Sequence, residues 1–203
     1  MRLDDDSSYN GWHHRQKKQV SLTRPDLLHS LGWRADRSEV EATVIPGKIV
    51  RFLEQHANVA FAGTRDRDRV PYGHRVSGWH VSADGRTLTA LVAEQFTVRL
   101  VESLEDNGEL ALTVEEFPSH ETYQFKGRYR CHRPPRDEDY AVVSRIRERF
   151  VKSMRHLFVD VPEPVLQAFT LKPSLAVEFD VREIFVQTPG PGAGTRLVPP
   201  AEQ

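Results

Sequence analysis

The sequence predicts a mainly β fold with peripheral helices, in the form of a small closed antiparallel barrel. Roughly five or six strand-like runs alternate with helical segments, and Asp84–Gly85 marks a tight hairpin that requires antiparallel pairing. So few strands cannot form a sandwich and also carry helices. Closing them into a barrel removes the exposed strand edges, so a barrel is the economical arrangement.

One helix precedes the predicted strands. It begins at Pro46–Gly47 and runs to Asn58, with Ile49, Val50, Leu53 and His56 recurring at helical spacing. The predicted strands cover residues 59–64, 70–82, 87–92, 109–114, 122–130 and 175–186. The charged run 65–69 makes the first turn.

Three further helices are predicted at residues 94–105, 137–157 and 163–169. The first is amphipathic and ends at Asn107–Gly108. A short helix over residues 24–31, capped by Asp26, is compatible with the spacing of its leucines. We expect a polar extension over residues 1–43, the barrel domain over 44–188 and a Pro/Gly-rich turning tail over 189–203. The residues before about Glu41 are expected to be dispensable for folding.

The charge balance narrows the function classes. Lys and Arg number 28 and Asp and Glu 29, a formal net charge of −1. This balance argues against a nucleic-acid binder and gives no attraction to an anionic membrane. No apolar run approaches the ~20 residues of a membrane helix, and the start of the chain lacks a secretory signal pattern. The single cysteine, Cys131, cannot form an intrachain disulfide, so we expect a cytoplasmic protein.

Several local patterns, taken in order over residues 46–187, resemble the pyridoxamine 5′-phosphate oxidase-like superfamily of FMN-binding split barrels. Residues 74–79 resemble the stretch with a basic residue near the flavin phosphate, and residues 91–97 lie where that family cradles the phosphate. Residues 107–112 resemble its step from asparagine to an apolar strand, and residues 123–127 its strand whose Gln contacts the flavin. The tail 187–194 is similar to one uncharacterised branch. The resemblance implies a six-stranded antiparallel split β-barrel and a homodimer with the cofactor at its interface.

One motif departs from the family pattern. The vitamin B6 oxidases themselves show a Ser-Arg-Lys step after the third strand, whereas this chain has Glu94, Gln95, Phe96 and Thr97 there. The substrate-binding segment of those oxidases is also not visible. Vitamin B6 chemistry is therefore not inferred.

The resemblance gives a set of candidate cofactor-binding residues: His74, Arg75, Val76, Val92, Ala93, Gln95, Thr97, Gln124 and Lys126. A flavin phosphate needs cationic or hydrogen-bonding donors, and Arg75 is a suitable fork. Gln95 and Thr97 lie in the first turn of a helix, whose N–H groups attract phosphate, although Glu94 opposes it. The alternative is that Glu94 and Gln95 only cap the helix and that Arg75 pairs with an acid.

Lys126 and Gln124 lie two residues apart on one strand and share a face. Near the flavin ring, they would stabilise the charge that the ring gains on reduction. The alternative is a solvent-facing pair. Trp79 could pack against a flat cofactor, although an aromatic residue on a strand is more often core.

We expect an FMN-dependent oxidoreductase acting on a small-molecule substrate, with no assigned catalytic residue. Two alternatives stay open: a non-catalytic flavin or haem binder or sensor, and a deazaflavin-dependent reductase. The nine histidines form no metal-binding motif, so no metal is expected, and Cys131 has no neighbouring base in sequence.

Overall fold

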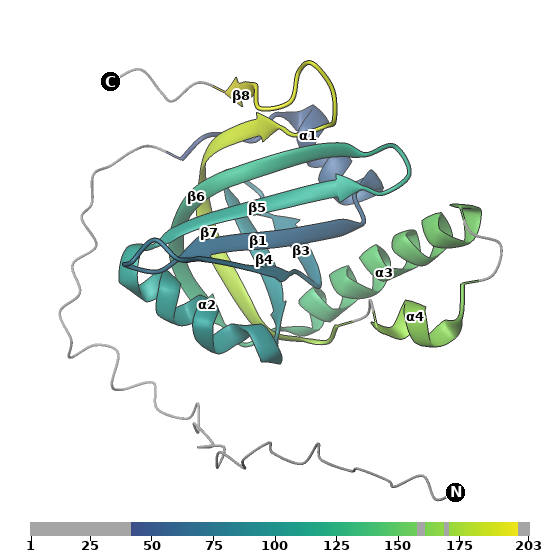
Figure 1. The fold of residues 1–203 in the computed structure, drawn as a ribbon, viewed down its shortest axis with the longest axis horizontal. Helices are drawn as coiled ribbons and strands as arrows, with labels where there is room; N and C mark the ends of the chain where they lie inside the picture. The colour runs from purple at the N-terminus through teal and green to yellow at the C-terminus, as the bar shows by residue number, and fades with distance from the viewer. Residues whose placement is uncertain (1–41, 158–160, 169–170, 199–203) are drawn as a thin grey trace, which may run out of the picture. The chain divides into compact units, whose positions relative to one another are not determined.

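The structure is a computed structural model that describes residues 42–157, 161–168 and 171–198. Its strands form one antiparallel sheet in the order β2-β1-β5-β6-β7-β4-β3, with β8 paired to β7 (Figure 1). The strands are β1 (Val59–Arg65), β2 (Pro71–Arg75), β3 (Gly78–Val81), β4 (Thr87–Ala93), β5 (Glu109–Glu116), β6 (Glu121–Arg133), β7 (Pro173–Val186) and β8 (Arg196–Val198). The predicted fold class is confirmed.

The second predicted strand, residues 70–82, is wrong as a single strand, and its break closes the barrel. Its first half is β2, which pairs with β1 at one edge of the sheet. Its second half is β3, which pairs with β4 at the other edge. Between them the N–H of Val76 donates to Ala60 O at 3.0 Å, and the N–H of Ser77 donates to Leu91 O at 2.7 Å. One bent segment therefore joins the two edges, and six strands close the barrel when β2 and β3 are counted as one.

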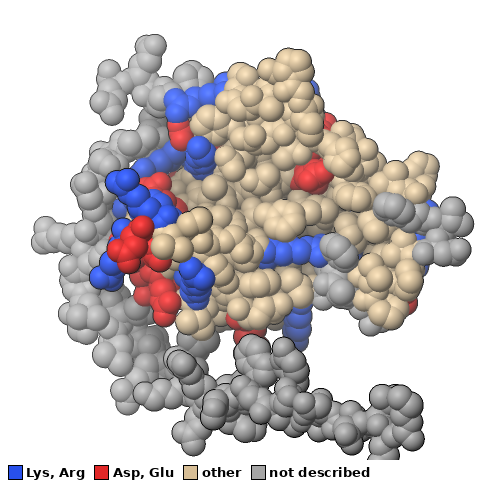
Figure 2. Space-filling model, viewed as in Figure 1, with Lys and Arg blue, Asp and Glu red and all other residues tan. Residues whose placement is uncertain are grey.

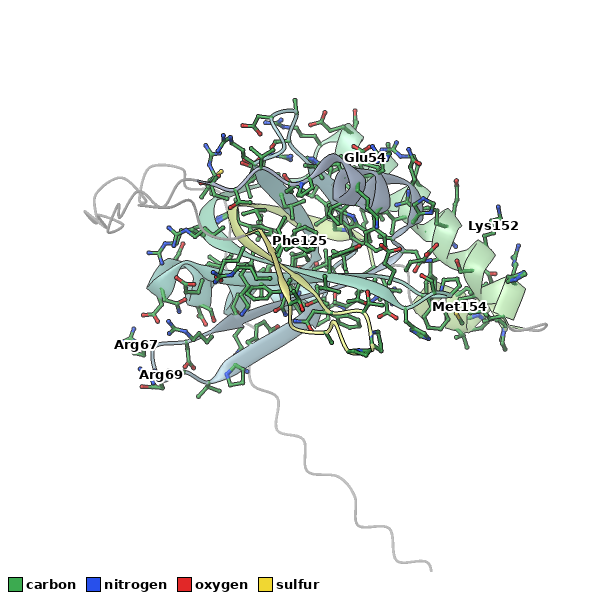
Figure 3. The ribbon with its side chains drawn as sticks, turned by 90° about the horizontal axis from the view of Figure 1, so that it is seen from above. Glu54, Arg67, Arg69, Phe125, Lys152 and Met154 are labelled. Carbon is green, nitrogen blue, oxygen red and sulfur yellow. The ribbon has the colours of Figure 1, made fainter. Side chains whose placement is uncertain are left out.

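Alternate residues of each strand point into the barrel, and most of these inward-pointing residues are apolar. The largest buried side chains include Phe179 on β7, Leu88 on β4 and Phe125 on β6, which is labelled in Figure 3. All seven residues of β4 are buried, which is expected for a strand covered on both faces. The cover on its outer side is α3 (Asp137–Leu157), since Leu91 of β4 packs in one buried cluster with Val143 of α3.

The helices lie around the barrel, as Figure 1 shows. The first expected helix is present but changes form, because α1 (Gly47–Arg51) continues as the π-helix η1 (Phe52–His56). α2 (Glu94–Asn107) ends at Gly108, whose φ of 69° is the left-handed cap that the sequence predicts. α4 is Glu163–Ala168.

The ends of the chain differ from expectation in detail. β6 extends one residue before and three residues after its predicted range, and the tail turns back at residues 188–194 to form β8, which was not predicted. The helix considered at residues 24–31 lies outside the described residues.

Candidate functional site

The outer surface of β2, β1, β5, β6 and the end of β7 carries two rows of side chains that cross the strands. The pairing register gives the first row as Arg75, Phe61, Thr113, Gln124 and Phe185. The second row is Gly73, Gly63, Ala111, Lys126 and Glu183. We call this surface the open face.

The open face is mostly uncharged. The Phe61 residue is 52% exposed, and three neighbouring positions of the second row have at most a methyl group. In Figure 2 the surface over β6, β5 and β1 has few charged side chains, which gather instead on the side where α2 and the β1–β2 turn lie. Such a surface suits a flat ligand or a second protein surface.

Arg75 lies at the border between the open face and α3. Its guanidinium carbon is 5.5 Å from the ring centre of Phe150 on α3, and burial lowers the pKa of this arginine. The hydroxyl of Ser77, two residues on, is buried with no hydrogen-bond partner in the described chain. Both line a cavity of about 20 Å³ together with Asn58 and Phe150. The side-chain amide of Asn58 is engaged, since it donates to Ser153 at 3.0 Å and accepts from the N–H of Phe117 at 3.0 Å.

These donors can be compared with the needs of FMN. A guanidinium and an unpartnered hydroxyl are groups that bind phosphate well. The cavity itself has room only for a group about the size of water, so a flavin ring does not fit inside it. The donor chemistry therefore fits a phosphate, while a flavin ring would have to lie outside, on the open face.

His74 faces inward, opposite to its neighbour Arg75. Its ring stacks on Phe96 of α2 with centroids 5.4 Å apart, and its Nε2 is buried without a hydrogen-bond partner in the described chain. Burial lowers the pKa of His74. The residue is therefore suited to be a neutral core histidine that holds the first turn of α2 against β2.

The other cofactor-binding candidates near β4 and α2 are partly buried and partly exposed. The side chains of Val76, Val92 and Ala93 are buried, so only their backbone can face a ligand. Gln95 is exposed, and the Thr97 hydroxyl donates to Glu94 O at 2.9 Å within α2.

On β6, Gln124 and Lys126 share the open face as the spacing predicts. The Gln124 amide donates to Thr113 at 3.1 Å. Lys126 is exposed, and its ammonium lies 4.5 Å from the ring centre of Phe185. Two strands, β1 and β5, separate these residues from Arg75, about 14 Å at the usual spacing of strands. One chain thus brings the phosphate-type donors and the ring-type donors to one surface but not into one pocket.

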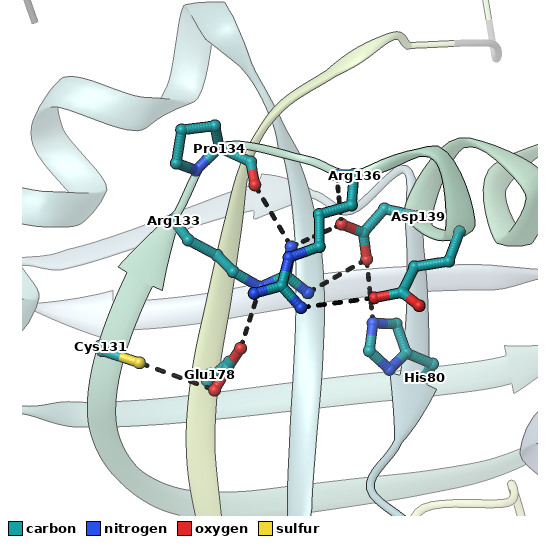
Figure 4. A network of polar contacts seen from close by, with 8 residues as sticks. His80, Cys131, Arg133, Pro134, Arg136, Asp139 and Glu178 are labelled. Carbon is teal, nitrogen blue, oxygen red and sulfur yellow. Dashed lines mark hydrogen bonds and ion pairs between the residues drawn. The ribbon is translucent and has the colours of Figure 1, made fainter.

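A buried polar network at the start of α3 was not predicted (Figure 4). The Asp139 carboxylate is fully buried and accepts from Arg133 at 2.6 Å, from the N–H of Arg136 at 2.7 Å and from His80 at 3.0 Å. Arg133 also donates to Glu178 at 3.1 Å. An acid three residues after the helix cap is a capping signal in the sequence, but its ion-pair partners come from β3 and β6, and Arg133 links it in turn to Glu178 on β7.

Cys131 borders this network. Its thiol contacts Glu178 at 3.6 Å, and burial with the nearby Glu178 carboxylate raises its pKa. A raised pKa leaves little thiolate, which argues against a nucleophilic role. The described residues contain no cluster of His, Cys, Asp and Glu suited to a metal ion, and no described helix is long and apolar enough to span a membrane.

Comparisons with known proteins give information on the fold of this chain and not on its ligand. No protein-family model and no curated protein matches the chain. Among solved structures, HupZ of Group A Streptococcus is 16% identical, covers 74% of this chain and 100% of its own, and has a TM-score of 0.45. An FMN-binding protein of Syntrophomonas wolfei is 12% identical and covers 68% of this chain and 83% of its own, at a TM-score of 0.42. HutZ, the haem storage protein of Vibrio cholerae, is 12% identical and covers 71% and 95%, at 0.40.

Others are a putative pyridoxamine 5′-phosphate oxidase of Lactobacillus delbrueckii and an F420 reductase. These neighbours have the split-barrel fold to which the sequence was likened, and the strand pairing described above gives that fold independently. At such identities and TM-scores they carry no argument about the ligand of this chain.

Sequence reasoning missed Phe61, Gly63, Gly73 and Ser77. Ser77 lies in the stretch 74–79 that resembles the family's phosphate segment but was not itself a candidate, and the other three lie in segments predicted only as strands, where the face they occupy depends on pairing partners far along the chain. Alternation in β1 indicates which residues share a face, but not that Gly63 and Gly73 lie opposite one another.

Proposed function

We propose that this protein binds FMN on its open face and works as a homodimer, as a flavin-dependent oxidoreductase. The observation that carries this proposal is the glycine pair Gly63 and Gly73 at the centre of two strands. A Cβ built on Gly63 meets nothing within 4 Å, and one on Gly73 meets only Ala62 O at 3.9 Å.

Glycine inside a strand costs stability relative to residues with side chains. Neither glycine has a positive φ, and the packing of this chain leaves space at both positions. The fold itself therefore does not need glycine there. A flat ring or another backbone approaching from outside does need it.

Arg75 and Ser77 support a phosphate at the border of the open face. A buried hydroxyl without a partner is costly, and an anion at this corner would take up that donor together with the guanidinium. A group larger than water requires that Phe150 or its helix give way, because the cavity is about 20 Å³.

Bound flavin supplies the redox chemistry, and the chain supplies binding, orientation and electrostatics. The amide of Gln124 can hydrogen-bond to a ring carbonyl, and the ammonium of Lys126 can stabilise negative charge beside it. Both side chains project from β6 on the open face.

A second copy of the chain is the expected cover of the open face. A single chain offers only one wall for a ring, and the exposed Phe61 beside small residues is suited to pack against a partner. A two-fold dimer is the commonest arrangement that buries such a surface. The single cysteine fits a reducing, cytoplasmic setting.

Identification of the bound cofactor tests the ligand. The protein is purified without added cofactor, its visible spectrum is recorded, and the molecule released on denaturation is weighed. FMN supports the proposal, whereas haem or a deazaflavin would overturn the flavin assignment. If the protein carries no cofactor, titration with FMN decides, and absence of saturable binding also overturns it.

Gly63→Val tests the open face. Valine is a better strand former, so the variant should keep or gain thermal stability as a fold. Its side chain should block ring and partner alike, so FMN affinity and dimer content should both fall. The control is Ser174→Val, at an exposed position of β7 outside the open face. A Gly63→Val dimer that binds FMN like the wild type would refute the site.

A further inference from the structure

A second cavity lies between α3, β3 and η1, and none of its lining residues belongs to the open face. Its volume is about 180 Å³. Leu53, Trp79 and Ile146 contribute apolar surface to it, and Arg145 and Arg149 contribute charge. Pockets for drug-sized ligands and cofactors start near ~300 Å³, so this one suits a smaller molecule than FMN or haem.

The two arginines are one helical turn apart on the same side of α3. Like charges at this spacing repel and destabilise a helix unless something offsets them. The described ion pairs of α3 are formed by Asp139, Glu138 and Arg147, and none is formed by Arg145 or Arg149. Burial, and then the charge of Arg145, lower the pKa of Arg149. Both observations describe a site with unbalanced positive charge.

One nitrogen of the Arg149 guanidinium already has a hydrogen-bond partner in the protein. Its Nη1 donates to the carbonyl of Glu54, where the π-helix η1 leaves backbone oxygens available (Figure 3 labels Glu54). The indole N–H of Trp79 donates to the neighbouring carbonyl of Leu53 at 3.2 Å. The Nε of Arg149 is buried and has no hydrogen-bond partner in the described chain. The Nε and Nη2 edge matches the two oxygens of a carboxylate, and the buried Nε would meet one when the Arg149 side chain turns toward the cavity.

The other polar groups at the cavity limit the charge of that ligand. His80 contributes its ring, but its Nε2 is engaged with Asp139 at 3.0 Å. Glu54 also lines the cavity and is exposed, so one negative charge already lies at its edge. A doubly charged phosphate is therefore disfavoured relative to a singly charged carboxylate. The apolar wall favours a ligand with an apolar body.

We propose that this cavity binds a small organic carboxylate, with the carboxyl group at Arg145 and Arg149 and the apolar body against Trp79 and Ile146.

The test uses benzoate as the probe and the full chain labelled with ¹⁵N. The chain has three tryptophans, and the resonance of Trp79 is assigned by replacing the other two, Trp12→Phe and Trp33→Phe. Benzoate should shift the Trp79 indole N–H signal saturably. Benzamide, the neutral analogue, and inorganic phosphate should each bind at least about tenfold more weakly.

Arg145→Met and Arg149→Met should each weaken benzoate about tenfold or more, and Arg149→Lys should recover part of the loss. Arg155→Met, on the same helix but outside this cavity, should change nothing. Glu54→Gln should tighten benzoate, because it removes the opposing charge.

Three results would overturn the proposal: equal binding of benzoate and benzamide, tighter binding of phosphate than of benzoate, or unchanged affinity when Arg145 is replaced. Arg145 is exposed, so we expect the Arg145→Met variant to fold. Its benzoate affinity therefore tests the proposal even if Arg149→Met does not fold. None of these readouts involves flavin.

Discussion

Two glycines of the sheet differ in what requires them. Gly127 on β6 lies where β6 and β7 change register, and a Cβ there would come 2.1 Å from Asp180 O and 2.6 Å from the Phe179 ring. Gly63 on β1 has open space around it. The fold itself requires glycine at position 127. At position 63 the fold leaves space for a side chain, so a glycine there is explained by a ligand or a partner that approaches from outside.

Gly127→Ala should destabilise the protein strongly. The added methyl would overlap backbone that cannot move without breaking the β6–β7 ladder, so we expect a loss of at least about 2 kcal/mol in the free energy of unfolding. Denaturant unfolding measures it. Gly63→Ala is the matched control and should change stability by well under 1 kcal/mol. Equal effects at both positions would contradict the distinction.

Arg75→Ala should weaken FMN far more than riboflavin, since the proposed partner of Arg75 is the phosphate, which riboflavin lacks. A charge-assisted contact of ~1.5–3 kcal/mol corresponds to about a tenfold to hundredfold loss in affinity. Fluorescence titration with both ligands measures it. An equal loss for the two would mean that Arg75 acts through its packing on Phe150 instead.

Lys126→Met should lower the midpoint potential of bound flavin by tens of millivolts, because the ammonium would stabilise the reduced, anionic ring. About 30 mV corresponds to ~1.4 kcal/mol for a two-electron couple. In a single chain Lys126 is exposed, where screening would weaken the effect, so the prediction depends on a partner that covers it. An unshifted potential with unchanged FMN affinity would assign Lys126 to solvent.

At the scale of elements, two kinds of contact hold α3 against the barrel: the apolar contacts of its buried side chains and the polar contacts of its first turn. Asp139, in the first turn of α3, accepts from the N–H of Arg136 just before the helix and from side chains of β3 and β6. Burial acts to raise the pKa of Asp139, but the hydrogen bonds from Arg133, Arg136 and His80 outweigh it and lower the pKa to about 2. This carboxylate therefore stabilises the folded state at neutral pH.

Stability should consequently fall as the pH drops from about 4 to about 2. A carboxyl whose pKa is lower in the folded than in the unfolded state contributes fully above the unfolded value and loses its contribution below it. We expect about 2 kcal/mol from Asp139. Asp139→Asn should lose that amount at pH 7 and show a flatter acid limb in unfolding experiments. Asp137→Asn, at an exposed position of the same turn, should behave like the wild type in this range.

The sequence predicted elements better than their connections. Alternation and hairpin residues located every barrel strand, and Gly108 marked the end of α2 correctly. The run 70–82 was predicted as one strand, although its apolar residues change phase between Val76 and Trp79. Its bend at Val76–Ser77 is imposed by hydrogen bonds to Ala60 and Leu91, which no local pattern contains.

The candidate site was predictable to the same degree. Gln124 and Lys126 could be placed on one face because they share a strand, and the structure agrees. That Arg75, Phe61 and Gln124 share a row depends on the register of four strands. The Asp139 network likewise combines residues from three strands and one helix, so only its capping contact was visible in the sequence.

At the scale of the whole molecule, the segment just before α1 belongs to the barrel. The Thr43 N–H donates to Val181 O at 2.7 Å, and its hydroxyl donates to Arg182 O at 2.9 Å. The Ile45 N–H donates to Gly85 O at 2.8 Å, and its side chain is 2% exposed. The polar extension expected over residues 1–43 thus contacts β7 at its end, through Thr43.

Two truncations should therefore behave differently. A chain that begins at residue 41 should keep its melting temperature, because the residues removed are polar and aperiodic in sequence. A chain that begins at residue 47 loses the contacts of Thr43 and the burial of Ile45, about 2–4 kcal/mol in all. At 2–4 °C per kcal/mol for a chain of this size, its melting temperature should fall by roughly 5–15 °C. Calorimetry of both, with light scattering to check that the oligomeric state is unchanged, measures the difference. A collapse of the longer chain would show that residues before 41 support the fold, and an unchanged shorter one would deny any role to the Thr43 and Ile45 contacts.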